Sequence, residues 1–310
     1  MTDATAPRAG LMQSAWASPI LLLILTTLIW AGHSIVGRLA VGQVAPMTLT
    51  CLRWGLALIP ILMAARTALR RDWPILRAHW QYMAAMGALG YTGFNALFYV
   101  AAHRTSALNL SIIQGAIPAL VLIGARLFLG ARFTVLQALG ALITMAGVAA
   151  IAAQGELSRL IALAFNGGDV MMFIAAVLYA GYTIGLRERP PVSGLSLLAG
   201  MAFAAFVTSV PLMIWEIAAG GFIWPTLAGY ATLVYVALGP AFVSQIMFMR
   251  GVELIGPGRA GVFVNLVPVF GAIMAVLILG EPFAAYHVVA LILVVGGIAI
   301  AQRNSTTAQR

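Results

Sequence analysis

Ten stretches of the sequence, each about 20 residues long and largely apolar, constrain the fold more than any other feature. An α-helix needs about 20 apolar residues to cross the hydrocarbon core of a bilayer. Only 8% of the 310 residues are charged, which is too few to cover a water-soluble protein of this length. The sequence therefore predicts an all-α integral membrane protein. The ten predicted transmembrane helices are 18–40, 46–65, 78–101, 105–128, 134–153, 168–186, 195–219, 227–250, 257–279 and 283–301.

The chain also contains an internal duplication. Residues 95–151 align without gaps on residues 245–301, at an offset of 150. An aromatic-Ala-Gly stretch likewise begins at Trp30 and again at Tyr179. The aligned identities include Phe98/Phe248, Pro118/Pro268, Leu129/Leu279, Gly130/Gly280 and Gly147/Gly297.

The duplication divides the ten helices into two repeats of five. Five is an odd number, so the second repeat enters the membrane from the opposite side. Inverted repeats of this kind are typical of transporters, in which the substrate site lies near the midplane between the halves. The sequence thus predicts two inverted five-helix repeats around a central cavity. A duplicated membrane scaffold that transports nothing is the alternative.

The arginines indicate an orientation. All 17 basic side chains are arginine, and 13 of them lie in the two tails, or in or next to the connections after the second, fourth, sixth and eighth helices. The others are Arg38, Arg53, Arg104 and Arg159. Because cytoplasmic loops of membrane proteins are enriched in Lys and Arg, both termini are predicted to be cytoplasmic. The net charge of +9 is then a topology signal, and we expect no nucleic-acid partner.

These observations predict a division of the chain into five parts. They are a cytoplasmic N-terminal tail (1–17), a first repeat (18–153), an external linker (154–167), a second repeat (168–301) and a cytoplasmic C-terminal tail (302–310).

The combination of these features resembles the drug/metabolite transporter superfamily, EamA-type. The resemblance rests on the two five-helix halves, the repeated aromatic-Ala-Gly stretch, Arg53 in the second helix and Leu279-Gly280-Glu281 before the last helix. The first-half equivalent, Leu129-Gly130-Ala131, lacks the acid, and the second half lacks a counterpart of Arg53.

Within that family the chain is most similar to bacterial exporters of aromatic and other neutral amino acids. The resemblance implies a multi-pass protein of the bacterial inner membrane that needs no cofactor. It also implies export of amino acids or related metabolites, so that the partners are a small-molecule substrate and the lipid bilayer.

Polar side chains within the apolar stretches are the candidate site residues, because a polar group in hydrocarbon is costly without a partner. Tyr91, Asn95 and Tyr99 recur every four residues and share a helix face. Asn95 and Gln245 occupy equivalent repeat positions. The predicted substrate-binding residues are Trp30, His33, Ser34, Tyr91, Asn95, Tyr99, Gln114, Tyr179, Tyr182, Gln245 and Asn265, with Pro118 and Pro268 predicted to kink their helices.

Each of these residues also has a structural interpretation. The aromatic side chains could simply pack between helices, the amides could form interhelical hydrogen bonds, and His33 could be a satisfied structural histidine. For Arg53, a structural role is favoured, in which it pairs with an acid or extends toward the interface.

The charges that are missing also bear on function. No carboxylate lies near the centre of a predicted helix, so a facilitator is favoured over proton exchange through a buried acid. A nearly neutral, aromatic and amide-lined cavity suits a zwitterion with an apolar side chain.

No catalytic or metal-binding motif lies at membrane depth, so we expect neither an enzyme nor a metal site. A multidrug efflux protein for cationic or aromatic compounds is the alternative transport function. The oligomeric state stays open, with a monomer favoured.

Overall fold

The computed structural model describes residues 16–130, 134–154, 156, 158 and 166–302, and this part of the chain is helical throughout, without strands. The first half contains α2 (Pro19–Leu39), α3 (Pro46–Ala78), α4 (Trp80–Met86), η1 (Gly87–Gly93), α5 (Phe94–Ala102), α6 (Ala107–Gln114), α7 (Ile117–Leu129) and α8 (Val135–Ala153). The second half contains α10 (Gly167–Gly185), η2 (Leu186–Glu188), α11 (Gly194–Ala218), α12 (Leu227–Leu238), η3 (Gly239–Val243), α13 (Ser244–Ile255), α14 (Pro257–Phe263), α15 (Leu266–Leu279) and α16 (Ala285–Gln302).

These elements form ten membrane passes, which confirms the predicted all-α fold. Eight of the described helices, counting continuous segments as one, are long and apolar enough to span a bilayer. The shorter apolar helix α8 and the continuous α4–η1–α5 segment provide the other two passes. Most observed ends fall close to the predicted ones. The exception is α3, which continues 13 residues beyond the predicted end at residue 65 because its last turns are helical but carry arginines.

Several predicted segments lie wholly or largely outside the described residues. These are most of the two tails and of the linker 154–167, together with Ala131 and the arginines Arg8, Arg132, Arg159, Arg303 and Arg310.

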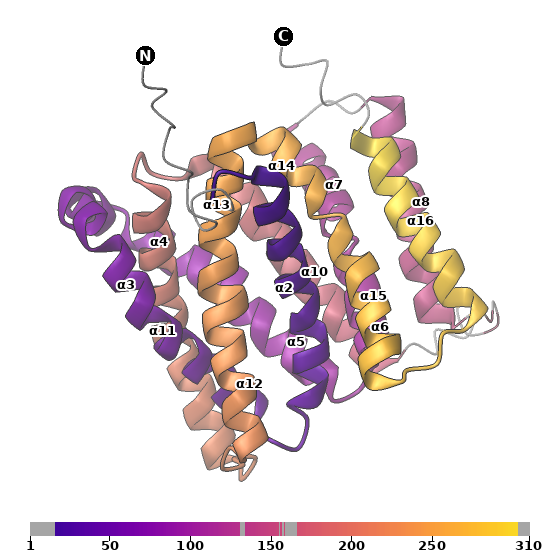
Figure 1. Ribbon diagram of the computed structural model, residues 1–310, viewed down its shortest axis with the longest axis horizontal. Helices are drawn as coiled ribbons and strands as arrows, with labels where there is room; N and C mark the ends of the chain where they lie inside the picture. Colours follow the sequence, from indigo (N-terminus) through magenta and orange to yellow (C-terminus); the bar gives the residue numbers. More distant parts are fainter. Residues whose placement is uncertain (1–15, 131–133, 155, 157, 159–165, 303–310) are drawn as a thin grey trace, which may run out of the picture.

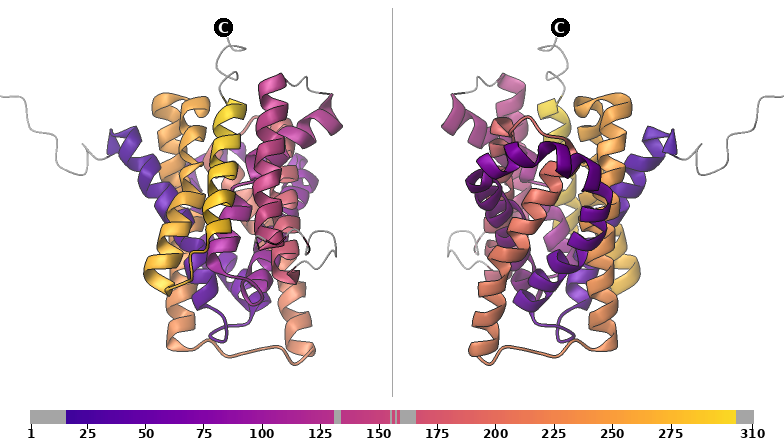
Figure 2. Two further views of the ribbon diagram at one scale, coloured as in Figure 1. Left: turned by 90° about the vertical axis from the view of Figure 1, so that its right-hand side faces the viewer. Right: turned by 90° about the vertical axis from the view of Figure 1, so that its left-hand side faces the viewer.

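The two halves are interleaved. The first helix of each half packs against the third and fourth passes of the other half: α2 contacts α13 and α15, while α10 contacts α5 and α7. Figure 1 shows α2 between α13 and α15, with its first residues and the end of α16 at the same end of the molecule. The second passes, α3 and α11, lie side by side, as do the fifth passes, α8 and α16 (Figure 2). Each half therefore completes the packing of the other.

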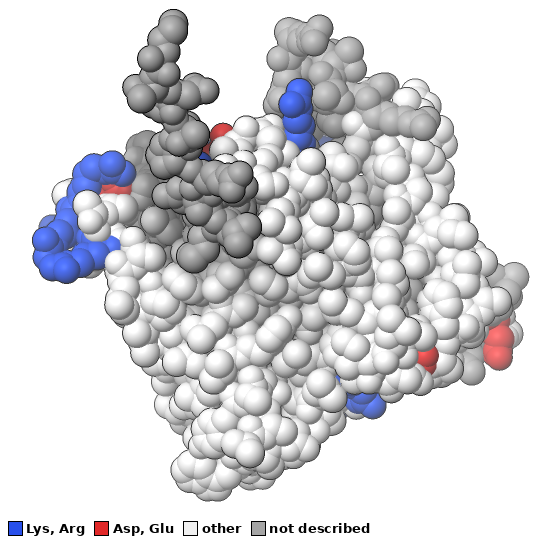
Figure 3. Space-filling view, in the orientation of Figure 1, with Lys and Arg blue, Asp and Glu red and all other residues white. Residues whose placement is uncertain are grey.

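The outer surface suits a lipid environment. Figure 3 shows a broad band without charged side chains, with arginine and acidic residues gathered toward the ends of the molecule. Apolar side chains such as Leu127, Phe128 and Leu277 are exposed on this surface. Five tryptophans are exposed, as is typical of side chains at the two interfaces of a bilayer. They are Trp16, Trp73, Trp80, Trp215 and Trp224.

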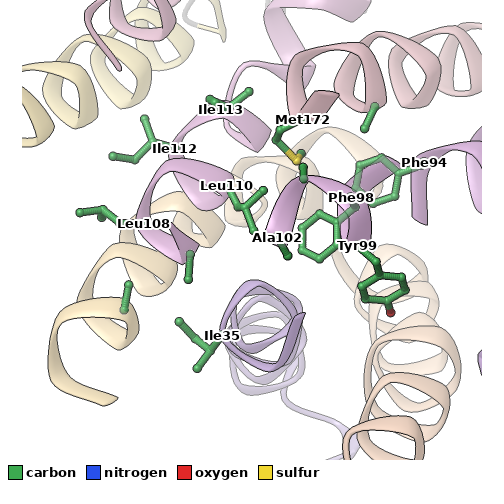
Figure 4. Packing of buried hydrophobic residues seen from close by; sticks show 14 of the residues in the cluster. Ile35, Phe94, Phe98, Tyr99, Ala102, Leu108, Leu110, Ile112, Ile113 and Met172 are labelled. Carbon is green, nitrogen blue, oxygen red and sulfur yellow. The ribbon is translucent and has the colours of Figure 1, made fainter. Parts of the chain in front are cut away.

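The main core lies where α2, α5, α6 and α10 meet (Figure 4). Phe98 and Tyr99 are completely buried there, and they pack with Ile35, Leu110 and Met172 from the other three helices. Each of these large side chains contributes about 1.5–3 kcal/mol in water, but in lipid it contributes mainly through close packing. This dense core fixes the position of α5, whose Phe94 and Asn95 line the cavity described below.

Four of the passes are irregular at equivalent places in the two repeats. The fourth and ninth passes are interrupted at residues 115–116 and 264–265, shortly before Pro118 and Pro268, whose rings lack an N–H and cannot continue the helical hydrogen bonds. The third and eighth passes contain the π-helical segments η1 and η3. Irregular backbone is tolerated at membrane depth only where it is buried in protein or lines a cavity.

Buried carboxylates join the two halves at helix ends. Glu216, near the end of α11, accepts hydrogen bonds from the backbone N–H groups of Met47 (2.9 Å) and Thr48 (2.8 Å) in the first turn of α3. Near the end of α3, Asp72 accepts one from the backbone N–H of Ser193 (2.8 Å), just before α11. The two antiparallel helices therefore cap each other at both ends. The sequence shows that these acids lie near helix ends, but it does not show that they are buried.

Two further carboxylates form contacts between the halves. Glu281, the acid of the Leu-Gly-Glu stretch, accepts hydrogen bonds from the N–H groups of Ala107 (2.8 Å) and Leu108 (2.9 Å) at the start of α6. Asp169, in the first turn of α10, accepts one from the hydroxyl of Thr105 (2.5 Å). A negative charge at a helix N-terminus satisfies unpaired N–H groups and interacts favourably with the helix dipole.

Replacing Glu216 by alanine leaves the first N–H groups of α3 without their acceptor. A hydrogen bond to a charged group contributes about 1.5–3 kcal/mol, so we expect Glu216→Ala to lose about 2 kcal/mol or more and to unfold at a lower temperature in detergent. Glu216→Gln keeps an acceptor oxygen and should lose less. The matched control is Glu253→Ala, which removes an exposed side chain of α13. Equal unfolding temperatures for Glu216→Ala and Glu253→Ala would contradict the capping role.

Candidate functional site

A cavity of about 130 Å³ lies between the two halves. Both repeats contribute to its wall, and the irregular segments of all four interrupted passes border it. Ten of the residues singled out from the sequence line it. They are Trp30, His33, Tyr91, Asn95, Gln114, Tyr179, Gln245 and Asn265, with Pro118 and Pro268.

Three predicted residues do not line this cavity. Tyr99 lies one turn beyond Asn95 and is buried in the core, where its hydroxyl hydrogen-bonds with cavity residues. Tyr182 packs behind Tyr91, with hydroxyl oxygens 3.4 Å apart and ring centroids 5.4 Å apart. Ser34 is buried next to His33, outside the lining. Helical periodicity groups Tyr99 with Asn95 on one helix face, but it does not give the depth of the cavity.

The lining reflects the pseudo-symmetry of the repeats. Asn95 and Gln245 follow the π-helical segments η1 and η3, which take up an extra residue per turn and turn the following side chains relative to a regular helix. Trp30 and Tyr179 come from the equivalent helices α2 and α10. Gln114 ends α6 at one interruption, and Asn265 precedes α15 at the other. Breaks in the helices thus place the amides in the wall.

Arg53 is the cationic member of the described lining, and sequence reasoning misjudged its surroundings. It neither pairs with an acid nor extends to the interface. Its side chain is buried, with 5% exposed, and its Nη1 donates hydrogen bonds to Nε2 of His33 (2.9 Å), Oδ1 of Asn95 and the hydroxyl of Tyr99 (3.0 Å). Because Nε2 of His33 accepts this bond, the imidazole is neutral in this arrangement.

The remaining hydrogen bonds hold this group in place. The amide nitrogen of Asn95 donates to the carbonyl oxygen of Tyr91 (2.5 Å), which orients its oxygen toward Arg53. The ring of His33 stacks on Phe98, with centroids 4.4 Å apart. The core in Figure 4 therefore supports the polar residues of the cavity from behind.

Aromatic rings form one wall of the cavity. Trp54 stacks on Tyr91, with ring centroids 4.5 Å apart and planes 5° apart, and Tyr179 packs against Phe94 at 5.1 Å. Gly90 allows the close approach of α10, because a Cβ there would collide with the ring of Tyr182. Sequence reasoning missed Trp54. Its place well inside a pass, away from the interfacial belts where tryptophan is common, was the available signal.

Comparison with known proteins identifies the family of the chain. A model of the EamA-like transporter family matches residues 17–153 and again residues 166–302. The chain belongs to the EamA-like transporter family. It is therefore a multi-pass membrane transporter, and the family implies a small-molecule substrate.

Its relatives are transporters of similar length. The uncharacterized transporter YyaM of Bacillus subtilis (strain 168) is 26% identical over 90% of this chain and 92% of that protein. A protein of Streptantibioticus cattleyicolor named "Probable terminal-alkyne amino-acid exporter" is 24% identical over 97% of both chains. A crystal structure superposes with a TM-score of 0.62 at 20% identity, covering 94% of this chain and 99% of the other, which shows a shared fold.

The cavity predicts a clear difference in the reactivity of engineered thiols. Cys51 is the single cysteine and is buried, so Cys51→Ala provides a background without reactive thiols. In that background, we expect Gln114→Cys in the cavity wall to react much faster with a small water-soluble thiol reagent than Ile112→Cys, which lies in the core on the same helix. The measurement is the labelled fraction over time, and equal rates would mean that water does not reach the cavity.

Proposed function

We propose that this transporter exports neutral or aromatic amino acids and related metabolites across the bacterial inner membrane by alternating access. One observation carries the proposal: the described lining of the cavity between the inverted halves combines a single guanidinium with amide groups and aromatic faces. Amides can hydrogen-bond both ends of a zwitterion, and aromatic faces accept an ammonium group or pack against an apolar side chain.

The size of the cavity and one relative support the same substrate class. Pockets for drug-sized ligands usually enclose about 300–1,000 Å³, and this one is smaller, at about 130 Å³. The relative from Streptantibioticus cattleyicolor carries amino-acid export in its name. Both favour a metabolite of amino-acid size.

Efflux of cationic drugs is the second transport function to consider, and the charge of the wall disfavours it. A cation entering the cavity would meet Arg53, and the described lining contains no carboxylate to compensate. The proposed function also accounts for the two-fold arrangement of the wall, which a non-transporting scaffold or an enzyme does not need.

We further propose the division into repeats 18–153 and 168–301, with both tails cytoplasmic and the linker 154–167 outside. The distribution of the arginines supports this orientation. It places the start of α2 and the end of α16 at the cytoplasmic face, and the starts of α3, α6 and α10 at the outer face.

Transport down the substrate gradient is the mode that we propose. Coupling to protons needs a group in the cavity that binds and releases a proton during the cycle. His33 is the histidine of the described lining, but its Nε2 is occupied by Arg53, and a second positive charge there would face the guanidinium. A facilitator needs no such group.

Purified protein in liposomes should accelerate the flux of amino acids. We expect uptake of radiolabelled L-phenylalanine, L-tyrosine, L-leucine or L-valine above that of protein-free vesicles, with a rate that follows the substrate gradient. An imposed proton gradient should leave the rate unchanged. Flux no faster than in protein-free vesicles for all four would contradict amino-acid transport, and a strong dependence on the proton gradient would contradict the facilitator.

Asn95→Ala should reduce this flux while leaving membrane insertion intact. The substitution removes an acceptor from Arg53, and a hydrogen bond to a charged group is worth about 1.5–3 kcal/mol, so we expect a loss of roughly tenfold or more. Gln81→Ala is the matched control, because Gln81 lies in the same pass and is exposed. Equal rates for the two variants would remove Asn95 from the site.

A further inference from the structure

Arg53 is a buried cation without a carboxylate partner. Among the described residues, ion pairs join Arg71 to Asp72 and Arg250 to Glu253, and neither involves Arg53. Its hydrogen-bond partners His33, Asn95 and Tyr99 are all neutral. A buried charge held only by neutral groups is costly, and an anion in contact with it lowers that cost.

The guanidinium bonds to the protein through only one of its three nitrogens. All three hydrogen bonds are made by Nη1. Nε is buried and has no hydrogen-bond partner among the described residues, and none of their hydrogen bonds involves Nη2. Nε and Nη2 point their N–H groups in parallel, and this edge matches the two oxygens of a carboxylate. The neighbouring Trp54 adds another donor to the lining, because its buried Nε1 also lacks a partner there.

The same cavity contains two acceptors without partners. Oε1 of Gln114 and Oδ1 of Asn265 are buried and accept no hydrogen bond from the described residues. The orientation of Asn265 is fixed, because its amide nitrogen donates to the side-chain oxygen of Gln302 (3.0 Å). Neutral amide oxygens of this kind can accept hydrogen bonds from an ammonium group.

We propose that Nε and Nη2 of Arg53 bind the carboxylate of the substrate, and that Gln114 and Asn265 accept hydrogen bonds from its ammonium group. This inference rests on the proposed transport of amino acids and specifies it further. A free carboxylate is then required for binding, and amines that lack one are rejected. Arg53 determines specificity, and its interactions with His33, Asn95 and Tyr99 position it.

A set of paired analogues tests this inference on the unaltered protein. The uptake of L-phenylalanine, L-tyrosine, L-leucine or L-valine into liposomes is measured in the presence of a competitor. For each amino acid, the competitor is either the same acid, unlabelled, or its carboxamide, which keeps the ammonium group and the side chain. We expect the carboxamides to compete at least about tenfold more weakly, because a site built for a carboxylate is left with unpaired donors. Equal competition by acid and carboxamide would overturn the role of Arg53 while leaving amino-acid transport intact. Absence of any amino-acid flux would instead contradict the proposed function.

Variants of Arg53 separate recognition from structure. In Arg53→Gln, the strength of competition by the acid relative to its carboxamide should fall toward one. A purely structural defect would instead weaken competition by both compounds equally. Arg53→Lys keeps the charge but lacks the two parallel N–H groups of Nε and Nη2, and it should give an intermediate ratio. Arg66→Gln is the matched control, since Arg66 is exposed on the same helix, and it should keep the ratio of the unaltered protein. An unchanged ratio in Arg53→Gln would overturn the inference.

The ammonium end has its own test. Gln114→Leu removes one acceptor and should weaken competition by L-phenylalanine several-fold. N-acetyl-L-phenylalanine lacks the ammonium group, so it should compete equally poorly for the variant and for the unaltered protein. Equal affinity of L-phenylalanine for the variant and the unaltered protein would contradict the role of Gln114.

Discussion

The need to satisfy every backbone polar group in the absence of water governs this structure. Helices do so internally except at their ends and breaks, and the chain uses its few charged and amide side chains at those places. Glu216, Glu281 and Asp72 accept from N–H groups at or next to helix N-termini. The breaks at residues 115–116 and 264–265 border the cavity, where irregular backbone can be accommodated. The positions of both the acids and the site therefore follow from one constraint.

This constraint also makes the two halves depend on each other. The carboxylate contacts run between halves, and the first helix of each half packs inside the other. The end of α11 and the starts of α6 and α10, which carry three of the four contacts, lie at the end of the molecule away from the start of α2 (Figure 1). The fourth contact, between Asp72 and Ser193, joins the last turns of α3 to the residue before α11. Under the proposed alternating access, an opening at the end away from the start of α2 has to separate helices that are held by three carboxylates, of which Glu216 and Asp169 are buried.

The sequence predicts the passes well, because hydrophobicity and length are local properties. It fails at the end of α3, where a polar, arginine-rich segment continues a helix that the apolar pattern does not extend. For the site, polar residues in apolar stretches and the repeat alignment lead to residues such as Asn95 and Gln245. The roles of Arg53 and Trp54 could not be predicted, since they depend on neighbours from other helices. Tyr99 carries the same periodic signal as Asn95, yet it lies one turn too deep in the core.

The separation of charges fits the proposed binding of a zwitterion, with neutral amides at its ammonium end. A carboxylate opposite Arg53 would also recognise an ammonium group, but it would pair with the guanidinium in the empty transporter, and the substrate would have to break that ion pair. Amide oxygens accept from the ammonium group without neutralising Arg53. The acids Asp72, Asp169, Glu216 and Glu281 are instead held at helix ends, three of them by backbone N–H groups. The absence of acids from the described lining thus leaves Arg53 available to the carboxylate of the proposed substrate.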